Sequence, residues 1–231
     1  MIIDVLTLFP EMFQGPLSAS IVKRAIKKGV LSVNLVNYRE FCKDKHKQVD
    51  DYPFGGAKGM VIKPEPIFEA VDFLKEKRKN IIKGKSFPII YLTPQGEIYN
   101  QKMATELSKE QYIIILCGHY KDVDYRVREH LVTHEISIGD YVLSGGELPA
   151  MVIIDSLARI QEGVLTHIES AETDSFQNNL LDGPYYTRPR VYRGYRVPDV
   201  LLSGDHKKIE KWQKRKRIEF TKKRRKDLVN D

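Results

Sequence analysis

One stretch decides the fold of this chain: Ser137-Ile138-Gly139-Asp140-Tyr141-Val142-Leu143-Ser144-Gly145-Gly146-Glu147-Leu148-Pro149. It is glycine-rich and follows a strand-like segment, as do Tyr91-Leu92-Thr93-Pro94-Gln95-Gly96 and Leu116-Cys117-Gly118-His119-Tyr120. Loops after the carboxyl ends of parallel strands are where α/β proteins bind ligands, and glycine lets the backbone approach a ligand closely. The three segments therefore predict one composite pocket, with three separate structural turns as the alternative.

The segments around these loops alternate between strand-like and helix-like patterns. The predicted strands are Ile2–Leu8, Leu31–Val36, Pro88–Leu92 and Tyr112–Cys117. The predicted helices are Ala19–Lys28, Pro66–Lys79, Gln101–Leu107, Asp124–Val132 and Pro149–Ile160. Regular alternation of this kind is typical of an α/β fold with a largely parallel sheet.

The character of the chain changes in its last third. Residues 167–179 are polar, contain few core candidates and predict an exposed linker. A stretch rich in proline, glycine and aromatic residues follows at 183–198, and a basic, helix-like end completes the sequence. We therefore predict a first domain at 1–163, a flexible linker at 164–178, and a small, mainly helical domain at 179–231.

Charge is distributed unevenly along the chain. The formal net charge is +7, but residues 207–226 contain twelve Lys or Arg and two acidic residues, so this end carries +10 and the rest −3. Such an end is typical of nucleic-acid binding, and a solvated tail is the alternative. No apolar run approaches the roughly 18 residues of a membrane helix, and the two cysteines are isolated. We expect no membrane partner and a cytoplasmic protein.

Several common cofactor and metal motifs are absent from the sequence. No segment has the P-loop pattern G-x-x-x-x-G-K-[ST], no G-x-G-x-x-G follows a strand, and no C-x-x-C offers a zinc site. His130 and His134 are four residues apart on a predicted helix, which would place two imidazoles on one face. Because no third ligand lies nearby, we interpret them as ordinary surface histidines and predict no metal site.

Five longer motifs carry a family resemblance. They are Asp50-Asp51-Tyr52-Pro53-Phe54-Gly55-Gly56, Leu92–Gly96, Ser137–Ala150, Glu172-Thr173-Asp174-Ser175-Phe176 and Tyr186-Thr187-Arg188-Pro189. In these motifs the chain closely resembles the bacterial TrmD family of tRNA (guanine-N1)-methyltransferases. The similarity extends from Leu8 to about Trp212, nearly the whole chain.

The resemblance implies a SPOUT-type α/β fold with a deep trefoil knot, a rare exception to unknotted topology. Members of the family bind S-adenosylmethionine in the knot and form homodimers with active sites at the subunit interface. They methylate N1 of the guanosine 3′ of the anticodon, position 37 of tRNA, and a magnesium requirement stays open. Matching positions place the cofactor cradle at Tyr91, Leu92, Thr93, Pro94, Gln95, Gly96, Gly118, Ser137, Ile138, Gly139, Asp140, Tyr141, Val142, Leu143, Gly145 and Gly146.

This chemistry needs a general base and a positive donor. Guanine N1 carries a proton that a base must remove, and the negative charge that moves to O6 must be stabilised. By the matching positions, Asp174 is the base and Arg159 is the partner of O6. Without the resemblance, Asp174 is interpreted as a solvated loop acid and Arg159 as a surface salt-bridge residue. An exposed aspartate is a weak base, so Asp174 requires tRNA to order the linker and exclude water.

One segment departs from the family pattern. After Gly118 the family commonly has Arg-Tyr-Glu-Gly, whereas this chain has His119-Tyr120-Lys121-Asp122. The change puts in doubt any role of the missing acid in magnesium or guanine recognition, and we hypothesise that Asp122 supplies the carboxylate instead. Two alternatives stay open: a SPOUT methyltransferase acting on another RNA, such as ribosomal RNA, and a non-catalytic RNA-binding protein with the same fold.

Overall fold

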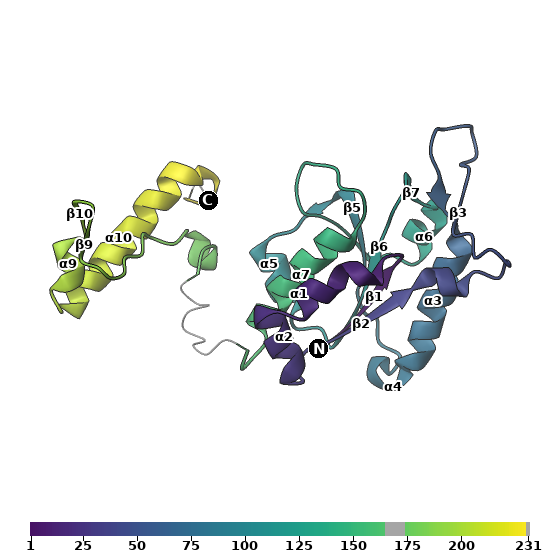
Figure 1. Cartoon of the computed structure of the whole chain (residues 1–231), viewed down its shortest axis with the longest axis horizontal. Coiled ribbons are helices and arrows are strands. Elements are labelled where there is room, and N and C mark those ends of the chain that lie inside the picture. Colours follow the sequence, from purple (N-terminus) through teal and green to yellow (C-terminus); the bar gives the residue numbers. More distant parts are fainter. Residues whose placement is uncertain (165–173, 230–231) are drawn as a thin grey trace. The chain divides into compact units, whose positions relative to one another are not determined.

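The computed structural model describes residues 1–164 and 174–229 (Figure 1). It divides into two compact units, Met1–Thr166 and His167–Asp231, each with its own secondary structure. Most of the predicted linker, residues 165–173, lies outside the described residues. The limits that we predicted for the linker therefore stay a prediction.

The N-terminal unit is built on a five-stranded parallel sheet in the order β2-β1-β6-β5-β8. Its strands are β1 (Ile2–Thr7), β2 (Ser32–Asn37), β5 (Ile89–Ile98), β6 (Tyr112–Cys117) and β8 (His134–Ser137). Strand β6 lies between β1 and β5 and is buried along its whole length, as its continuous apolar sequence requires. The predicted α/β class with a parallel sheet is confirmed.

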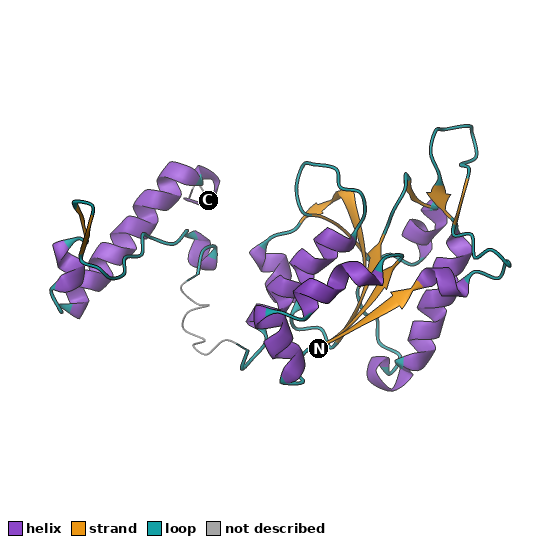
Figure 2. Cartoon of the chain, viewed as in Figure 1, coloured by secondary structure: helices purple, strands orange, loops and turns teal. Residues whose placement is uncertain are grey.

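Helices cover both faces of this sheet (Figure 2). They are η1 (Pro10–Phe13), α1 (Gln14–Leu17), α2 (Ser20–Lys27), η2 (Tyr38–Phe41), α3 (Pro64–Lys77), α4 (Lys79–Ile82), α5 (Gln101–Leu107), α6 (Tyr125–His130) and α7 (Glu147–Ile160). Successive side chains of a strand point to opposite faces, so β6 contributes to two cores. Ile113 and Ile115 pack with α2, α5 and α7, whereas Ile114 and Leu116 pack with α3 and α6.

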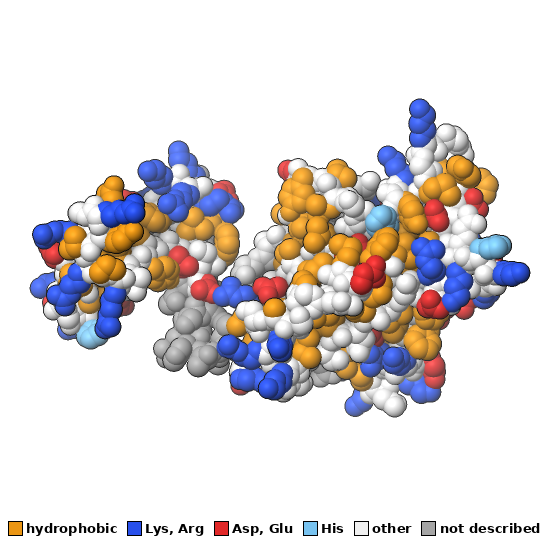
Figure 3. Space-filling model, viewed as in Figure 1, with side chains coloured by type: hydrophobic (Ala, Val, Ile, Leu, Met, Phe, Trp, Pro, Cys, Tyr) orange, Lys and Arg blue, Asp and Glu red, His pale blue; other side chains and the backbone are white. Residues whose placement is uncertain are grey.

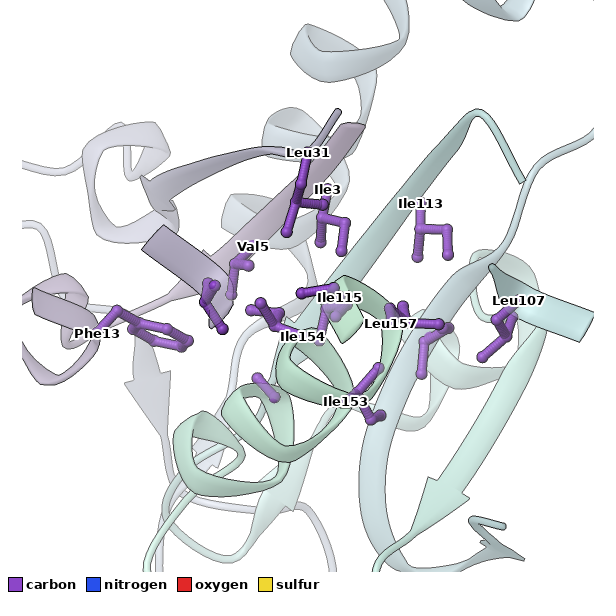
Figure 4. Close-up of a cluster of buried hydrophobic side chains, with 14 of the residues drawn as sticks. Ile3, Val5, Phe13, Leu31, Leu107, Ile113, Ile115, Ile153, Ile154 and Leu157 are labelled. Carbon is purple, nitrogen blue, oxygen red and sulfur yellow. The ribbon is translucent and has the colours of Figure 1, made fainter. Parts of the chain in front are cut away.

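Helix α7 is held to the sheet by an apolar face. Ile153, Ile154 and Leu157 are buried in the first core and lie near side chains of β1 and β6 (Figure 4). Full burial of each such side chain contributes roughly 1.5–3 kcal/mol. Because α7 begins at Glu147, directly after the glycine-rich stretch, this packing anchors the carboxyl end of that loop.

A second, three-stranded sheet has the order β3-β4-β7. Its strands are β3 (Asp50–Asp51), β4 (Val61–Ile62) and β7 (Asp122–Val123). Strand β4 pairs antiparallel with β3 and parallel with β7. The sheet thereby fixes the ends of loop 52–60 to the segment that follows β6. Strands of two residues are too short for a period-two pattern, so the sequence did not predict them.

Two local predictions differ from the structure. Strand β5 does not end at Leu92 but continues to Ile98, and its register against β8 shifts between Leu92 and Glu97. The prediction that His130 and His134 share a helix was wrong, because α6 ends at His130 and His134 begins β8. Pairing with β5 begins just before β8, because the backbone N–H of Thr133 donates to the carbonyl of Ile89 at 2.9 Å.

The C-terminal unit contains a small hairpin and a long basic helix. Its described elements are η3 (Gln177–Asn179), β9 (Val191–Tyr192), β10 (Tyr195–Arg196), α9 (Asp199–Leu202), α10 (His206–Arg224) and η4 (Lys226–Val229). Asp205 caps α10 by accepting from the backbone N–H of Lys208 at 3.1 Å. Trp212 is buried against the rest of the unit, which explains why so basic a helix is held in place. The predicted helical basic end is confirmed.

Candidate functional site

A cavity of about 300 Å³ lies where β5, β6 and β8 approach their carboxyl ends. The residues predicted as a cradle that line it are Tyr91, Leu92, Thr93, Pro94, Gln95, Gly118, Ser137, Ile138, Gly139, Tyr141, Val142, Leu143, Gly145 and Gly146. Parallel pairing of β5 with both β6 and β8 brings these segments to one edge of the sheet. The structure therefore joins the three segments in one cavity rather than in separate turns.

Two residues of the predicted cradle are not part of this lining. An added Cβ at Gly96 would overlap the backbone of Glu135 and Ile136, so this glycine permits the close approach of β5 to β8. Asp140 is exposed at the tip of the glycine-rich loop. Gly96 therefore contributes to the pairing of two strands, and contact of either residue with the cofactor stays a prediction.

The cavity also has lining residues that the sequence did not single out as a cradle. They are His119, Tyr120, Lys121, Asp122, Ile136, Ser144 and Pro149. Four of them directly follow Gly118, so adjacency to a predicted glycine was the available signal. Of these, His119 packs against Phe9 with tilted rings and a centroid distance of 5.0 Å, and its backbone pairs with Gly145. This bridge ties the loop after β6 to the loop after β8.

Two glycines hold the backbone close to the cavity wall. An added Cβ at Gly118 would lie 2.8 Å from the hydroxyl oxygen of Tyr91, and one at Gly146 would lie 2.7 Å from Cα of Cys117. Real Cβ atoms essentially never approach so closely. At these positions the cavity is edged by bare backbone, which is what close contact with a small molecule requires.

A charged network stands behind one wall of the cavity. Arg128 of α6, whose side chain is 9% exposed, donates to both carboxylate oxygens of Glu135 at 2.8 and 2.7 Å. It also donates to Asp122 at 3.0 Å and to the side-chain oxygen of Gln95 at 2.8 Å. The other oxygen of Asp122 accepts from the hydroxyl of Tyr91 at 2.7 Å. One guanidinium thus connects Gln95 of β5, Asp122 of β7 and Glu135 of β8.

The network also sets the charge states of its members. Hydrogen bonds from Arg128 lower the pKa of Glu135 below its ordinary value. Burial, followed by the negative charge of Asp122, raises the pKa of Tyr91 well above its ordinary value. Tyr91 therefore remains a neutral phenol that donates to Asp122, and the wall keeps this arrangement throughout the neutral pH range.

Residues 1–231 match the model of the family tRNA (Guanine-1)-methyltransferase TrmD. The chain belongs to this family. Among the similar proteins, three from different organisms are each named tRNA (guanine-N(1)-)-methyltransferase. The one from Anoxybacillus flavithermus is 55% identical over 98% of this chain and 91% of its own length. Those from Desulforamulus reducens and Caldanaerobacter subterraneus are each 53% identical over 99% of this chain, and over 89% and 92% of their own lengths. The predicted family and its methyltransferase class are confirmed.

In this TrmD-family chain the two predicted catalytic residues belong to different units. Arg159 lies half-buried in the last turn of α7, which begins at the cavity. Asp174 lies half-buried in the C-terminal unit. After burial itself, the negative charges of Asp182 and Asp174 raise the pKa of Tyr185, so these side chains lie near one another. The catalytic roles of Arg159 and Asp174 stay predictions.

The segment that departs from the TrmD pattern forms part of the cavity. Both carboxylate oxygens of Asp122 are engaged, one by Tyr91 and the other by Arg128, so its role in substrate recognition stays a hypothesis. The buried Nδ1 of His119 has no hydrogen-bond partner among residues 1–164 and 174–229. Within the same residues, no group of three or more His, Cys, Asp or Glu could hold a metal ion, and no helix is long and apolar enough to cross a membrane.

Proposed function

We propose that this chain transfers a methyl group from S-adenosylmethionine to N1 of the guanosine 3′ of the anticodon, position 37, in tRNA. One observation carries the proposal: the segments that resemble the TrmD cofactor cradle meet around a single cavity in a chain that matches the family along its whole length. The names of its relatives support tRNA as the substrate and guanine N1 as the methylated atom. No observation favours ribosomal RNA.

The cavity fits S-adenosylmethionine in size and chemistry. Its volume of about 300 Å³ lies at the lower end of the roughly 300–1,000 Å³ that is usual for small-molecule sites. Leu92, Ile138 and Leu143 offer apolar contact for a nucleobase, and Gly118 and Gly146 keep side chains away from the backbone edge. When bound, the sulfonium compound supplies a methyl group that needs only in-line placement about 3–3.5 Å from its acceptor.

The residues of the chain prepare the acceptor atom. We propose that Asp174 removes the N1 proton of guanine and that Arg159 donates to O6 as negative charge develops there. Arginine suits this role because its charge persists and its fork presents several donors. Following the family resemblance, the proposal includes a homodimer in which one subunit contributes Arg159 and its partner contributes Asp174.

The remaining parts of the proposal concern the surroundings of the reaction. The basic helix α10 holds the tRNA backbone, and the chain threads the trefoil knot that its family resemblance implies. A cytoplasmic location, where tRNA is found, is also part of the proposal. Magnesium stays open, and no step assigned to the residues of the chain requires it.

The proposal is tested by methylation of defined transcripts. Unmodified tRNA transcripts with guanosine at position 37 are incubated with the protein and S-adenosylmethionine carrying a radioactive methyl group. Their counterparts with adenosine at that position serve as the matched control. Incorporation into the first set alone supports the proposal. Incorporation into ribosomal RNA fragments but not tRNA would replace the substrate, and binding of tRNA without any turnover would indicate a non-catalytic RNA-binding protein.

A further inference from the structure

The C-terminal unit presents a group of exposed side chains on the hairpin formed by β9 and β10 and on the segment that directly precedes it. The segment Gly183–Pro198 contains four tyrosines, four arginines and no acidic residue. Tyr186, Tyr192 and Tyr195 are 49%, 60% and 81% exposed. Exposed aromatic side chains in such a cluster contribute little to a core, and grouped exposure of this kind is typical of an interaction surface.

The hairpin holds its tyrosines in a defined arrangement. Tyr192 and Tyr195 are direct partners in the antiparallel ladder, so both side chains lie on the same face. They are joined by the two-residue turn Arg193–Gly194, in which both φ angles are positive, 51° and 82°. Such a turn matches the twist of the two strands, and a further bond from the N–H of Val197 to the carbonyl of Arg190 at 3.0 Å extends the pairing.

A hollow lies beside this face. Its volume is about 410 Å³, and its lining consists of Tyr186, Thr187, Arg188, Pro189, Tyr192, Tyr195, Arg196 and Val197. The guanidinium of Arg193 lies 5.4 Å from the ring centroid of Tyr192. The face therefore combines flat aromatic rings with planar cations around a space that is large enough for a nucleobase.

The described residues of the unit do not neutralise the arginines of this segment. None of Arg188, Arg190, Arg193 and Arg196 forms an ion pair with a described residue, whereas Lys208, Lys216 and Arg225 of the same unit do. Lys and Arg side chains are also spread over the visible face of this unit (Figure 3). A partner with negative charge and flat, stackable groups complements this surface, and RNA with unpaired bases has both properties.

We propose that the tyrosine–arginine surface, formed by Tyr186, Arg188, Tyr192, Arg193, Tyr195 and Arg196, stacks unpaired bases of RNA. The inference rests on the proposed tRNA substrate and adds a second kind of contact to it. The tyrosine rings take the faces of the bases, and the arginines meet the adjoining phosphates. A regular duplex keeps its bases stacked inside the helix, so this surface selects nucleotides of the tRNA that lie outside its stems.

The test measures binding of the full-length protein to a fluorescent single-stranded RNA octamer and to a blunt RNA duplex, without S-adenosylmethionine. Base–aromatic stacking contributes about 1–3 kcal/mol per base. Since 1.4 kcal/mol corresponds to a tenfold change, the loss of one stacked base weakens binding by about 5- to 150-fold. The double variant Tyr192→Ala/Tyr195→Ala should therefore lose at least about fivefold in affinity for the octamer, with its affinity for the duplex and its salt dependence unchanged. Tyr192→Phe/Tyr195→Phe should bind normally, because the rings remain.

Two controls separate stacking from charge. Tyr125→Ala removes an equally exposed tyrosine of the N-terminal unit and should leave octamer binding unchanged. Replacing the basic residues 222–225 with alanine should instead weaken the binding of both RNAs. The slope of log affinity against log salt concentration should become shallower by up to about 0.7–0.9 per lost phosphate contact.

Octamer binding that survives the alanine double variant would overturn the proposal, as would an equal loss of duplex binding. An acidic protein partner would be indicated if neither RNA depended on the surface. Because the octamer assay requires no methyl transfer, its outcome is independent of the methylation test: normal methylation with unchanged octamer binding would refute the stacking surface alone.

Discussion

Replacing Arg128 with methionine would show whether the wall of the proposed S-adenosylmethionine cavity is held by charge. Arg128 contacts Asp122, Glu135 and Gln95 at the same time. Methionine retains an unbranched apolar stem of similar reach but offers no donor. The variant therefore removes the hydrogen bonds while leaving the packing of α6 largely in place.

The expected magnitude follows from the geometry. A hydrogen bond to a charged group contributes about 1.5–3 kcal/mol, and Arg128 donates three to carboxylates. The side chains of Asp122 and Glu135 are 29% and 31% exposed, so water replaces part of what is lost. We expect the free energy of unfolding to fall by roughly 2–3 kcal/mol, below the ~3–5 kcal/mol of a fully buried pair. Affinity for S-adenosylmethionine should fall about tenfold, which corresponds to ~1.4 kcal/mol, as Tyr91 loses its fixed partner.

Urea denaturation and calorimetric titration with S-adenosylmethionine measure the two effects. The matched control is Arg126→Met in the same helix, which breaks the ion pair with the capping residue Asp124. Arg126 is 61% exposed, and exposed pairs contribute about 0–1 kcal/mol. Equal destabilisation by the two variants would refute the account of the wall, and so would unchanged affinity for the cofactor in Arg128→Met.

The same pair predicts a pH dependence. Hydrogen bonds from Arg128 lower the pKa of Glu135 in the folded protein. The pair therefore stabilises the fold fully at pH values above the ordinary pKa of glutamate, ~4.3. The effect is lost as pH falls through the lowered folded pKa. The stability difference between the wild type and Arg128→Met should therefore shrink on acidification below that range. A difference that grows under these conditions would contradict the assignment.

Two further predictions concern the loop after β8 and the assembly of the active site. At Gly145 an added Cβ would lie 2.8 Å from the ring of His119. Gly145→Ala should therefore lower the free energy of unfolding by about 1–3 kcal/mol through overpacking and weaken cofactor binding in calorimetry. Gly15→Ala is the control and should do neither, because the space around Gly15 is open. If each site takes Arg159 from one subunit and Asp174 from the other, Arg159→Ala and Asp174→Asn homodimers should be nearly inactive, but their equimolar refolded mixture should recover about a quarter of wild-type activity. Activity that stays at the level of the parents would exclude a shared site.

The fold could be predicted where a long buried segment has a recognisable pattern of apolar residues. Tyr112–Cys117 is continuously apolar because it lies in the middle of the sheet, and the apolar face of α7 has helical spacing. The two-residue strands β3, β4 and β7 carry no such pattern, since their pairing depends on distant segments. His134 was misplaced for the same reason: the pairing of β8 with β5 overrides the local helix pattern.

The site could be predicted in part. Glycines after strands indicated the cavity, because a close backbone approach is a local requirement that leaves a local signal. The role of Arg128 could not be predicted, since Gln95, Asp122 and Glu135 reach it only through the pairing of separate strands. On its own helix it has the appearance of a solvated surface residue. The tyrosine–arginine surface is local in sequence, but its common face depends on the turn at Arg193–Gly194.

The central claim, methyl transfer to guanine N1 of tRNA, is tested most directly by identifying the methylated atom. Unmodified tRNA transcripts are incubated with the protein and S-adenosylmethionine bearing a trideuterated methyl group, then digested to nucleosides and analysed by mass spectrometry against the N1-, N2- and N7-methylguanosine standards. The account predicts trideuterated 1-methylguanosine, confined to the ribonuclease fragment that contains position 37. Label in any other methylguanosine, or in a fragment outside the anticodon loop, would contradict it.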